Sequence, residues 1–362
     1  MVSIAVMRFS GRGGHVDGCS VDRRGDMSVL AALGGVLVLV VVWASVLRTV
    51  LIPRQTSSRM ARWTARMAAA VGMAIARRLP RRACESVMDF CAPVSLLLMM
   101  IGWLLGLGLG FALLALAAGV AFDADAMIRF FEFKLAGTAG VLAVFAAVSV
   151  TVVIAVFLAH VVRFVDAYSR RERFVNRLAA QASRIPDGDR VLAEYLRSGS
   201  RDNLDSHFAE WADWLADVHG SHICYPGLVY HRPSGDLWWP HAAMIVMDAA
   251  ALVDAVAPKW APPHTRALLD SGTACLQQLA ERIGVVVPEL TVSLHGREEC
   301  SFGDTVELAT TAGLPAERDP YQAWAAFQDT RVRYAPYAVM IGTRLMWHGA
   351  PEEDEVEQSG LR

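Results

Sequence analysis

The stretch from Ala92 to Phe122, APVSLLLMMIGWLLGLGLGFALLALAAGVAF, contains no charged residue and decides the class of this protein. A helix needs about 20 apolar residues to cross a hydrocarbon core of about 30 Å. Two more runs, at 28–53 and 135–162, are long and nearly free of charge. Since backbone polar groups cannot be left bare in lipid, we expect these three runs to be transmembrane helices.

The composition of the whole chain agrees with a membrane protein and excludes other classes. Of the 362 residues, 54% are hydrophobic and 19% are charged, whereas soluble domains carry about 25% charged residues. The net charge of −2 gives no field that would attract a polyanion, so we expect no nucleic-acid partner. The 6 cysteines form no C-x-x-C pair, which favours free thiols in a reducing compartment or at its membrane.

The arginines outside the apolar runs predict the orientation of the chain. Segment 54–91 has a series of arginines before its first acidic residue, Glu85, and more arginines follow the third run. Cytoplasmic loops are enriched in arginine and lysine. We therefore expect a multi-pass protein of the plasma membrane, with 54–91 and the C-terminal region in the cytoplasm and the N-terminus outside.

Segment 54–91 also has the pattern of a basic amphipathic helix, cytosolic or at the membrane interface. Arg59, Arg62 and Arg66 recur at helical spacing, with Trp63 and Met67 between them. Such helices lie on the inner leaflet and attract anionic lipids, by about 1 kcal/mol per arginine. Its partners are thus expected to be the lipid bilayer and its anionic lipids, although a plain topology signal explains the arginines equally well.

Both ends of the chain are expected to be disordered. Residues 1–27 lack the apolar core of a signal peptide, and Met27 directly precedes the first span, so translation can start at Met1 or at Met27. Residues 349–362 contain a short acidic run and are expected to form a disordered tail.

Two spans carry small residues four positions apart. They are Gly102, Gly106 and Gly110 in the second span, and Ala139, Ala143 and Ala147 in the third. Small residues let helix backbones approach closely in lipid. We expect the two stripes to form a tight hairpin or an oligomer seam, and the protein to be a homo-oligomer.

The cytoplasmic edge of the third span contains His160, Arg163 and Asp166. These residues are candidates for a gate or an interface, and an interfacial anchor is the favoured interpretation. No span carries a charge at mid-depth, where proton relays and voltage sensors have theirs.

Beyond the third span, the pattern is helical. No helix breaker occurs before Ile185, so 163–184 is predicted to be a helical stalk. Residues 185–348 have helical periodicity and predict an all-α cytosolic domain. Near its end, Arg331 interrupts an apolar stripe and is expected to pair with an acid on a neighbouring helix, while Pro336 should split the last helix.

The helical domain shows no catalytic motif. Phosphate-binding loops, dinucleotide-binding loops and nucleophile elbows are absent from the sequence. His219, His222 and Cys224 are the only clustered metal-ligand types, and without a nearby fourth ligand they favour local packing over zinc. We expect no enzyme and no cofactor.

Several short motifs carry a resemblance to a known family. They are Leu47-Arg48-Thr49, Ile52-Pro53-Arg54, Ala136-Gly137-Thr138, Tyr168-Ser169-Arg170-Arg171-Glu172 and Glu317-Arg318-Asp319-Pro320. From about residue 28 to 348, the chain resembles uncharacterised actinobacterial integral membrane proteins that are distantly similar to two-transmembrane potassium channels. The resemblance implies channel-like spans followed by a cytosolic helical domain, and it implies no particular activity.

The sequence departs from that family at the pore. A potassium filter is a T-V-G-Y-G-like loop whose carbonyls replace the hydration shell of the ion. Only 123–134 separates the second and third spans, and Thr138-Ala139-Gly140-Val141 is at most a remnant of a filter. A pore helix, a filter and a full span do not fit between Gly137 and Ser169, so the filter is expected to be lost.

Two functions follow from these observations. The favoured one is a channel-like membrane protein with a degenerate pore, acting as a sensor, scaffold or subunit through its cytosolic domain. The alternative is a functional ion channel or pore with weak or no selectivity. A membrane-anchored enzyme is a distant third because the sequence shows no catalytic constellation.

Overall fold

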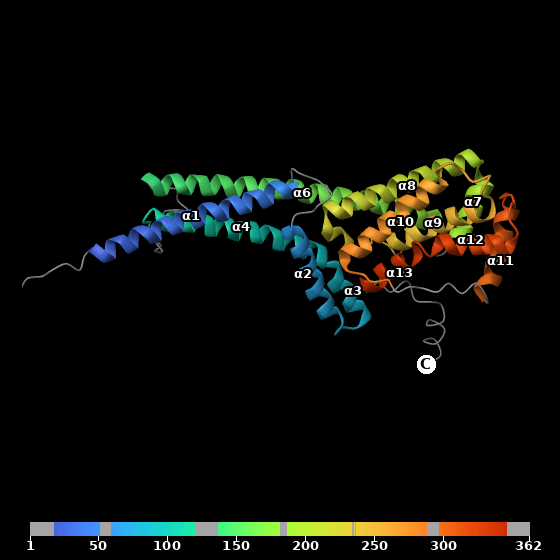
Figure 1. The fold of residues 1–362 in the computed structure, drawn as a ribbon, viewed down its shortest axis with the longest axis horizontal. Helices are drawn as coiled ribbons and strands as arrows, with labels where there is room; N and C mark the ends of the chain where they lie inside the picture. The colour runs from blue at the N-terminus through green and yellow to red at the C-terminus, as the bar shows by residue number, and fades with distance from the viewer. Residues whose placement is uncertain are drawn as a thin grey trace, which may run out of the picture. The chain divides into compact units, whose positions relative to one another are not determined.

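The computed structural model describes residues 18–50, 59–120, 137–181, 187–233, 235, 237–287 and 297–345. Over these residues the chain is α-helical, with one 3-10 helix and no strand, which confirms the all-α class (Figure 1). The helices are α1 (Gly18–Val50), α2 (Arg59–Ala76), α3 (Arg81–Asp89), α4 (Cys91–Ala117), α6 (Gly137–Gln181), α7 (Gly188–Ser198), α8 (Arg201–Cys224), η1 (Pro226–Tyr230), α9 (Trp239–Val256), α10 (His264–Ile283), α11 (Arg297–Thr311), α12 (Pro320–Arg331) and α13 (Ala335–Arg344).

Four helical segments are long and apolar enough to cross a membrane. They are Asp26–Thr49, Ser86–Ala117, Gly137–Ala180 and Trp239–Val256. The first three are mostly exposed, with 17–22% of their apolar windows buried inside the protein, whereas 78% of the Trp239–Val256 window is buried. The first three therefore present their apolar surface outward, and the fourth covers its surface with other helices.

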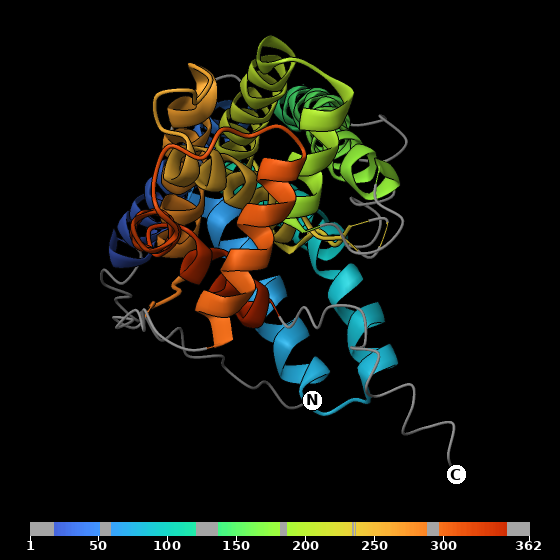
Figure 2. The same ribbon diagram turned by 90° about the vertical axis from the view of Figure 1, so that its right-hand side faces the viewer.

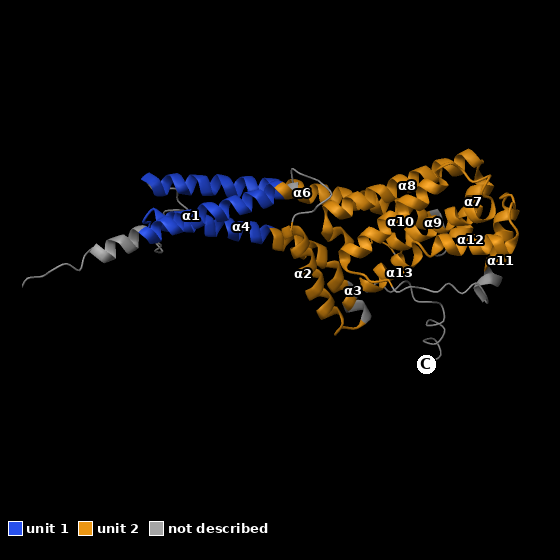
Figure 3. Ribbon diagram, in the orientation of Figure 1, with its two compact units in different colours: residues 1–47, 100–157 blue, residues 48–99, 158–362 orange. Residues whose placement is uncertain are grey.

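The chain divides into two compact units, coloured in Figure 3. The first contains residues 1–47 and 100–157, and the second contains residues 48–99 and 158–362. Helix α6 contributes its first part to one unit and its last part to the other, without a break in the helix.

In the first unit, glycines bring α4 against α1. A Cβ atom added at Gly106 would lie 2.5 Å from Val42 Cγ2, and one added at Gly110 would lie 2.7 Å from Leu39. Gly35 faces Gly110 in return, because a Cβ atom there would lie 2.9 Å from the Gly110 carbonyl oxygen. This is the close backbone approach that small residues permit in apolar surroundings.

The glycine stripe was expected to face the alanine stripe of α6, and that prediction is wrong for Gly106 and Gly110, which contact α1. Gly102, at the start of the stripe, is half-buried. The next residue, Trp103, is fully buried and its indole Nε1 donates to Ser45 Oγ of α1 at 3.2 Å. The α1–α4 contact thus combines glycine packing with a polar interhelical bond.

The alanines of α6 do not form one buried stripe either. Ala143 is buried, but Ala139 and Ala147 are only partly covered. A residue at every fourth position advances by about 40° around the helix, since each residue turns about 100°. The buried positions of α6 are instead separated by three, four or seven residues, which keeps them on one face: Ala143, Ala146, Val153, Phe157, His160, Phe164, Ala167 and Arg171.

The second unit is a helical bundle with α9 at its centre. Nearly every residue of α9 is buried, and the helix contacts α7, α8, α10, α12 and α13. Figure 2 shows this bundle from a second direction. Tryptophans from several helices join the same core, including Trp211, Trp214, Trp239 and Trp324. A helix surrounded by protein is apolar on all sides, which explains its high hydropathy without a membrane.

Two predicted boundaries differ from the structure. Helix α1 begins at Gly18, before the predicted start of the first span at residue 28, and the expected disorder of residues 1–27 stays a prediction. An established helix extends by one hydrogen bond per residue, and it does not stop where the apolar run stops. Residues 1–17 and the predicted tail at 349–362 lie outside the described part of the chain.

The predicted stalk at 163–184 is instead part of the second unit. Its helix runs to Gln181, and Val175 and Leu178 belong to the hydrophobic core built with α7, α8 and α9. Their spacing from Phe164, Ala167 and Arg171 continues the buried face of α6. The many charged residues between these positions lie on the other faces of the helix.

The last helical stretch is split as Pro336 predicts, since α12 ends at Arg331 and α13 begins at Ala335. Arg331 pairs with Asp248 of α9, with its Nε 3.1 Å from Oδ1, which confirms the expected partner on a neighbouring helix. The Tyr334 hydroxyl donates to the same oxygen at 2.6 Å. Asp248 therefore ties the end of the chain to the central helix.

Candidate functional site

The most unusual site in the described residues is a buried charge pair where α6 enters the second unit. Arg171 is 1% exposed and Glu172 is 4% exposed. The Arg171 guanidinium contacts one Glu172 oxygen through Nε at 2.9 Å and Nη2 at 2.8 Å. We call Tyr168, Arg171, Glu172, His222 and His231 the Arg171 cluster.

Further hydrogen bonds connect Arg171 to three other parts of the chain. Nη1 donates to the Leu228 carbonyl of η1 at 3.0 Å, and Nη2 donates to the His231 carbonyl at 2.9 Å. The Trp214 indole of α8 donates to the backbone carbonyl of Arg171 at 3.2 Å. One side chain and its own carbonyl thus join α6, α8, η1 and the segment that follows η1.

His222 of α8 completes the polar contacts. Its Nδ1 lies 2.7 Å from the Val218 carbonyl, which can only accept, so Nδ1 carries the proton. Nε2 is then an acceptor, and it lies 3.3 Å from Arg171 Nη1. Burial, and then the positive charge of Arg171, hold the pKa of His222 well below its ordinary value, so the ring is neutral at pH 7.

Aromatic rings surround this polar core. Tyr168 stacks on His231 with ring centroids 4.1 Å apart, and the Arg171 guanidinium carbon lies 5.2 Å from the Tyr168 centroid. Phe164 contacts the same histidine ring at 6.0 Å. These rings exclude water from the charge pair, and Arg171 gains a cation–π contact.

The predicted gate residues lie at the N-terminal edge of this site and do not form one cluster. His160 is buried against Tyr225, with ring centroids 5.2 Å apart. Arg163 and Asp166 are exposed. Asp166 pairs with Arg170 one turn further on, and Arg170 Nε also bonds Asp217 of α8 at 3.1 Å.

The three metal-ligand candidates have separate surroundings. His219 Nε2 bonds Gln278 of α10 at 2.9 Å, His222 belongs to the Arg171 cluster, and Cys224 is half-buried. Within the described ranges, no three His, Cys, Asp or Glu side chains lie close enough together to hold a metal ion. The contacts of His219 and His222 are those of packing residues.

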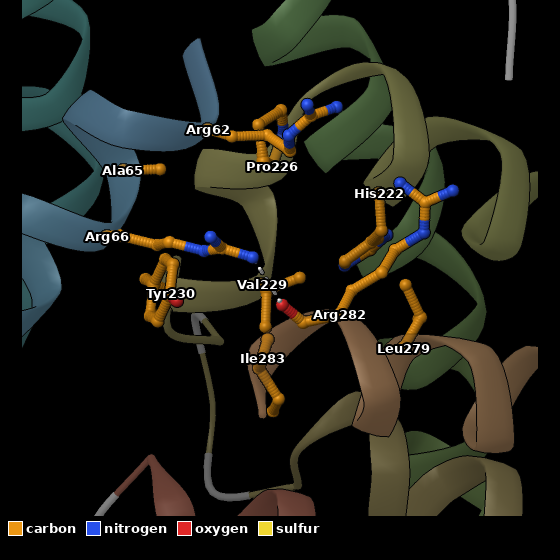
Figure 4. A pocket seen from close by; sticks show the side chains of 10 residues that line it. All are labelled: Arg62, Ala65, Arg66, His222, Pro226, Val229, Tyr230, Leu279, Arg282 and Ile283. Atoms are coloured by element: carbon orange, nitrogen blue, oxygen red, sulfur yellow. Dashed lines mark hydrogen bonds between the residues drawn. The ribbon is translucent and has the colours of Figure 1, made fainter. Parts of the chain in front are cut away.

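A small cavity lies behind His222, between α2, α8, η1 and α10 (Figure 4). Its volume is about 50 Å³. Arg62 and Arg66 reach it from α2, and Arg282 reaches it from the last turn of α10. We call it the arginine pocket.

Arg171 and Glu172 were not among the predicted site residues, although a signal for them exists. Arg171 occupies a position in the 3,4-spaced stripe that contains Phe164, Ala167 and Leu178. An arginine in an apolar stripe needs a buried partner, as was reasoned for Arg331. Around Arg171, the neighbouring charged residues Arg170, Glu172 and Arg173 make the apolar stripe hard to recognise in the sequence.

The polar groups of the Arg171 cluster bond to one another and to the backbone. His222 uses both ring nitrogens in bonds to protein, and the Glu172 carboxylate bonds to Arg171. In comparisons with known proteins, no family model, curated protein or solved structure matches this chain. The resemblance to potassium-channel-like proteins therefore stays a prediction, and the function must be argued from the site.

Proposed function

We propose that this chain is an integral protein of the plasma membrane whose C-terminal helical domain acts in the cytoplasm as a sensor, scaffold or subunit, coupled to the third span by α6. One observation carries the proposal. Helix α6 is unbroken over 45 residues, begins in the apolar first unit and holds Arg171 at the centre of the buried polar site.

We infer three spans, with α9 as a core helix. Its apolar surface is covered by other helices, and it carries Asp248, whose partners come from α12 and the turn after it. A charged residue inside a lipid-facing helix is costly. The same acid in a protein core costs little when it pairs with an arginine and a hydroxyl.

We further propose that the protein is channel-like and that its pore is degenerate. A filter requires non-helical backbone whose carbonyls point into the pore. Residues 137–181 form one continuous α-helix, which includes the Thr138-Ala139-Gly140-Val141 remnant. This supports loss of the filter from that part of the chain.

Helix α2 supports the proposed contact with anionic lipids. One of its faces packs small side chains inside the second unit, including Ala65, Ala69 and Gly72. Trp63 and Met67, on another face, are exposed together with Val71 and Ile75. An exposed apolar stripe beside Arg59, Arg62 and Arg66 is the pattern of an interfacial helix.

The coupling is tested by changing the bilayer around the spans. The full chain is reconstituted in nanodiscs of short-chain and long-chain phosphatidylcholine, and hydrogen exchange is measured in peptides covering residues 218–231. Hydrophobic mismatch tilts or bends spanning helices. We expect exchange at 218–231 to depend on lipid length in the wild type and in Arg170→Met, and not in Arg171→Met.

Two results would contradict coupling through α6. One is exchange in the wild type that does not depend on lipid length, and the other is an equal response in Arg171→Met and Arg170→Met. Circular dichroism checks that each variant is folded, and Glu172→Gln replaces Arg171→Met if that variant is not.

Ion flux separates the proposal from the alternative of a functional pore. The protein in proteoliposomes is tested with potassium, sodium and chloride. We expect leakage equal to that of protein-free vesicles. Protein-dependent flux of any of these ions would favour the pore, and subunit counting by native mass spectrometry would then show whether the expected homo-oligomer surrounds it.

A further inference from the structure

The arginine pocket combines an apolar wall with several positive charges. Its lining from η1 and α10 includes Pro226, Val229, Leu279 and Ile283, while Arg62, Arg66 and Arg282 supply the guanidinium groups. No carboxylate belongs to this lining among the residues that the structure describes. Guanidinium groups beside an apolar wall form a site where an anion can bind through charge-assisted hydrogen bonds.

The arginines come from α2 and α10, and Arg66 is oriented by a hydrogen bond. Arg66 Nη2 donates to the backbone carbonyl of Arg282 at 3.4 Å, which orients its planar fork at the end of α10 (Figure 4). A guanidinium has five N–H groups, so this bond leaves others for a ligand. Arg62 lies one turn earlier on α2, on the side of Pro226.

Two neutral groups, Tyr230 and His222, also line the pocket, and positive charges lie beside them. Burial raises the pKa of Tyr230, and the nearby charges of Arg66 and Arg344 oppose that rise. His222, which lines the pocket, is backed by Arg171. A ligand in the pocket would thus meet cations and neutral donors.

The size of the cavity limits the ligand. About 50 Å³ accommodates a few water molecules, since one water needs about 10–15 Å³ by this measure. A phosphate group, with its four oxygens, has comparable size. Guanidinium forks match phosphate oxygens in geometry and charge, and bind them more strongly than they bind neutral acceptors.

We propose that the arginine pocket binds a phosphoryl group between Arg62, Arg66 and Arg282, supplied by the phosphate monoester of an acidic lipid or by free phosphate. This inference deepens the proposed function by naming a ligand for the helical domain, and it rests on that function only in placing α2 at the membrane surface. The lipid-length experiment does not involve the pocket, so the two proposals can fail separately.

The test uses the full chain in nanodiscs. Thermal unfolding is followed in phosphatidylcholine discs with sodium phosphate, against sodium chloride of equal ionic strength, and in discs that also contain phosphatidic acid. Stabilisation by phosphate in phosphatidylcholine discs supports the pocket with free phosphate as its ligand. Stabilisation by phosphatidic acid, without stabilisation by sodium phosphate, supports the pocket with a lipid headgroup as its ligand.

Matched variants show whether the pocket is responsible. Arg66→Gln and Arg282→Gln should weaken the apparent affinity for the stabilising ligand about tenfold or more, the loss expected for a charge-assisted hydrogen bond. Arg266→Gln on α10 removes the same charge outside the pocket lining and should leave the affinity unchanged. If a glutamine variant does not fold, Arg66→Lys or Arg282→Lys takes its place and should weaken binding less.

Two outcomes would overturn the inference. In the first, neither phosphate nor phosphatidic acid stabilises the wild type. In the second, Arg266→Gln loses as much affinity as Arg66→Gln and Arg282→Gln, which would indicate diffuse attraction to a basic surface.

Discussion

Arg171 is the residue on which the coupling of α6 to the helical domain depends most. Its charge is buried, and its guanidinium is bonded to Glu172, to two backbone carbonyls and to His222. Breaking a buried pair by removing one partner leaves an uncompensated charge, which costs about 3–5 kcal/mol. The stability of the site therefore depends on all the partners of Arg171 being present, more than on any one hydrogen bond.

We predict that Glu172→Gln and Arg171→Met each lower the free energy of unfolding by about 3–5 kcal/mol. Arg170→Met is the matched control, since Arg170 is partly exposed and its pairs with Asp166 and Asp217 are worth about 0–1 kcal/mol. Denaturant unfolding in detergent, followed by tryptophan fluorescence, measures all three. Equal stabilities for Arg171→Met and Arg170→Met would contradict the role of the buried pair.

His222 makes the stability of the domain depend on pH. Because its pKa is lowered in the folded protein, the unfolded chain binds a proton below about pH 6.5 where the folded chain does not. The free energy of unfolding should therefore be highest at neutral pH and fall as the pH drops below about 6.5. His222→Gln should show a shallower fall, and not a flat line, because burial also lowers the pKa of His207 and His231. Denaturant titrations over this pH range provide the measurement, and an unchanged slope in His222→Gln would count against the assignment.

At the scale of helices, close packing decides which elements pair. The α1–α4 contact depends on glycine because the backbones approach at Gly35 and Gly110. The face of α6 that meets protein follows the 3,4 spacing of Phe157, His160 and Phe164. The positions of side chains around a helix thus determine which helix it packs against. The presence of small residues alone does not determine the partner.

We predict that Gly110→Leu destabilises the first unit by about 1–3 kcal/mol, the usual cost of overpacking a tight contact. Gly108→Leu provides the control, because a Cβ atom there meets nothing within 4 Å. Both changes remove a glycine from the same helix, so differences in helix propensity cancel. Thermal stability in detergent should fall for Gly110→Leu only, and equal effects would show that α1 and α4 do not pack through this face.

At the scale of the molecule, the sequence predicts the all-α class and the three exposed apolar helices because these depend on local composition. It also predicts the Arg331 partner and the break at Pro336, since each follows from a single residue in a clear pattern. The glycine stripe was assigned the wrong partner because a stripe does not say which helix it faces. The Arg171 cluster and the arginine pocket were missed because their residues come from segments far apart in the sequence.

The topology of the second unit decides whether the chain has three spans or four. If α9 is a core helix, the segments before and after it lie on the same side of the membrane. If it is a fourth span, they lie on opposite sides. Asp202 on α8 and Lys259 after α9 are both exposed and bracket the helix in sequence.

The most direct measurement is labelling of Asp202→Cys and Lys259→Cys with a membrane-impermeant maleimide, in intact and in permeabilised spheroplasts. Asp125→Cys, between the second and third apolar runs, is the control expected to be labelled in intact spheroplasts. We predict that Asp202→Cys and Lys259→Cys are labelled above the background of the parent protein only after permeabilisation. Labelling of one of the two in intact spheroplasts would make α9 a fourth span and contradict the account.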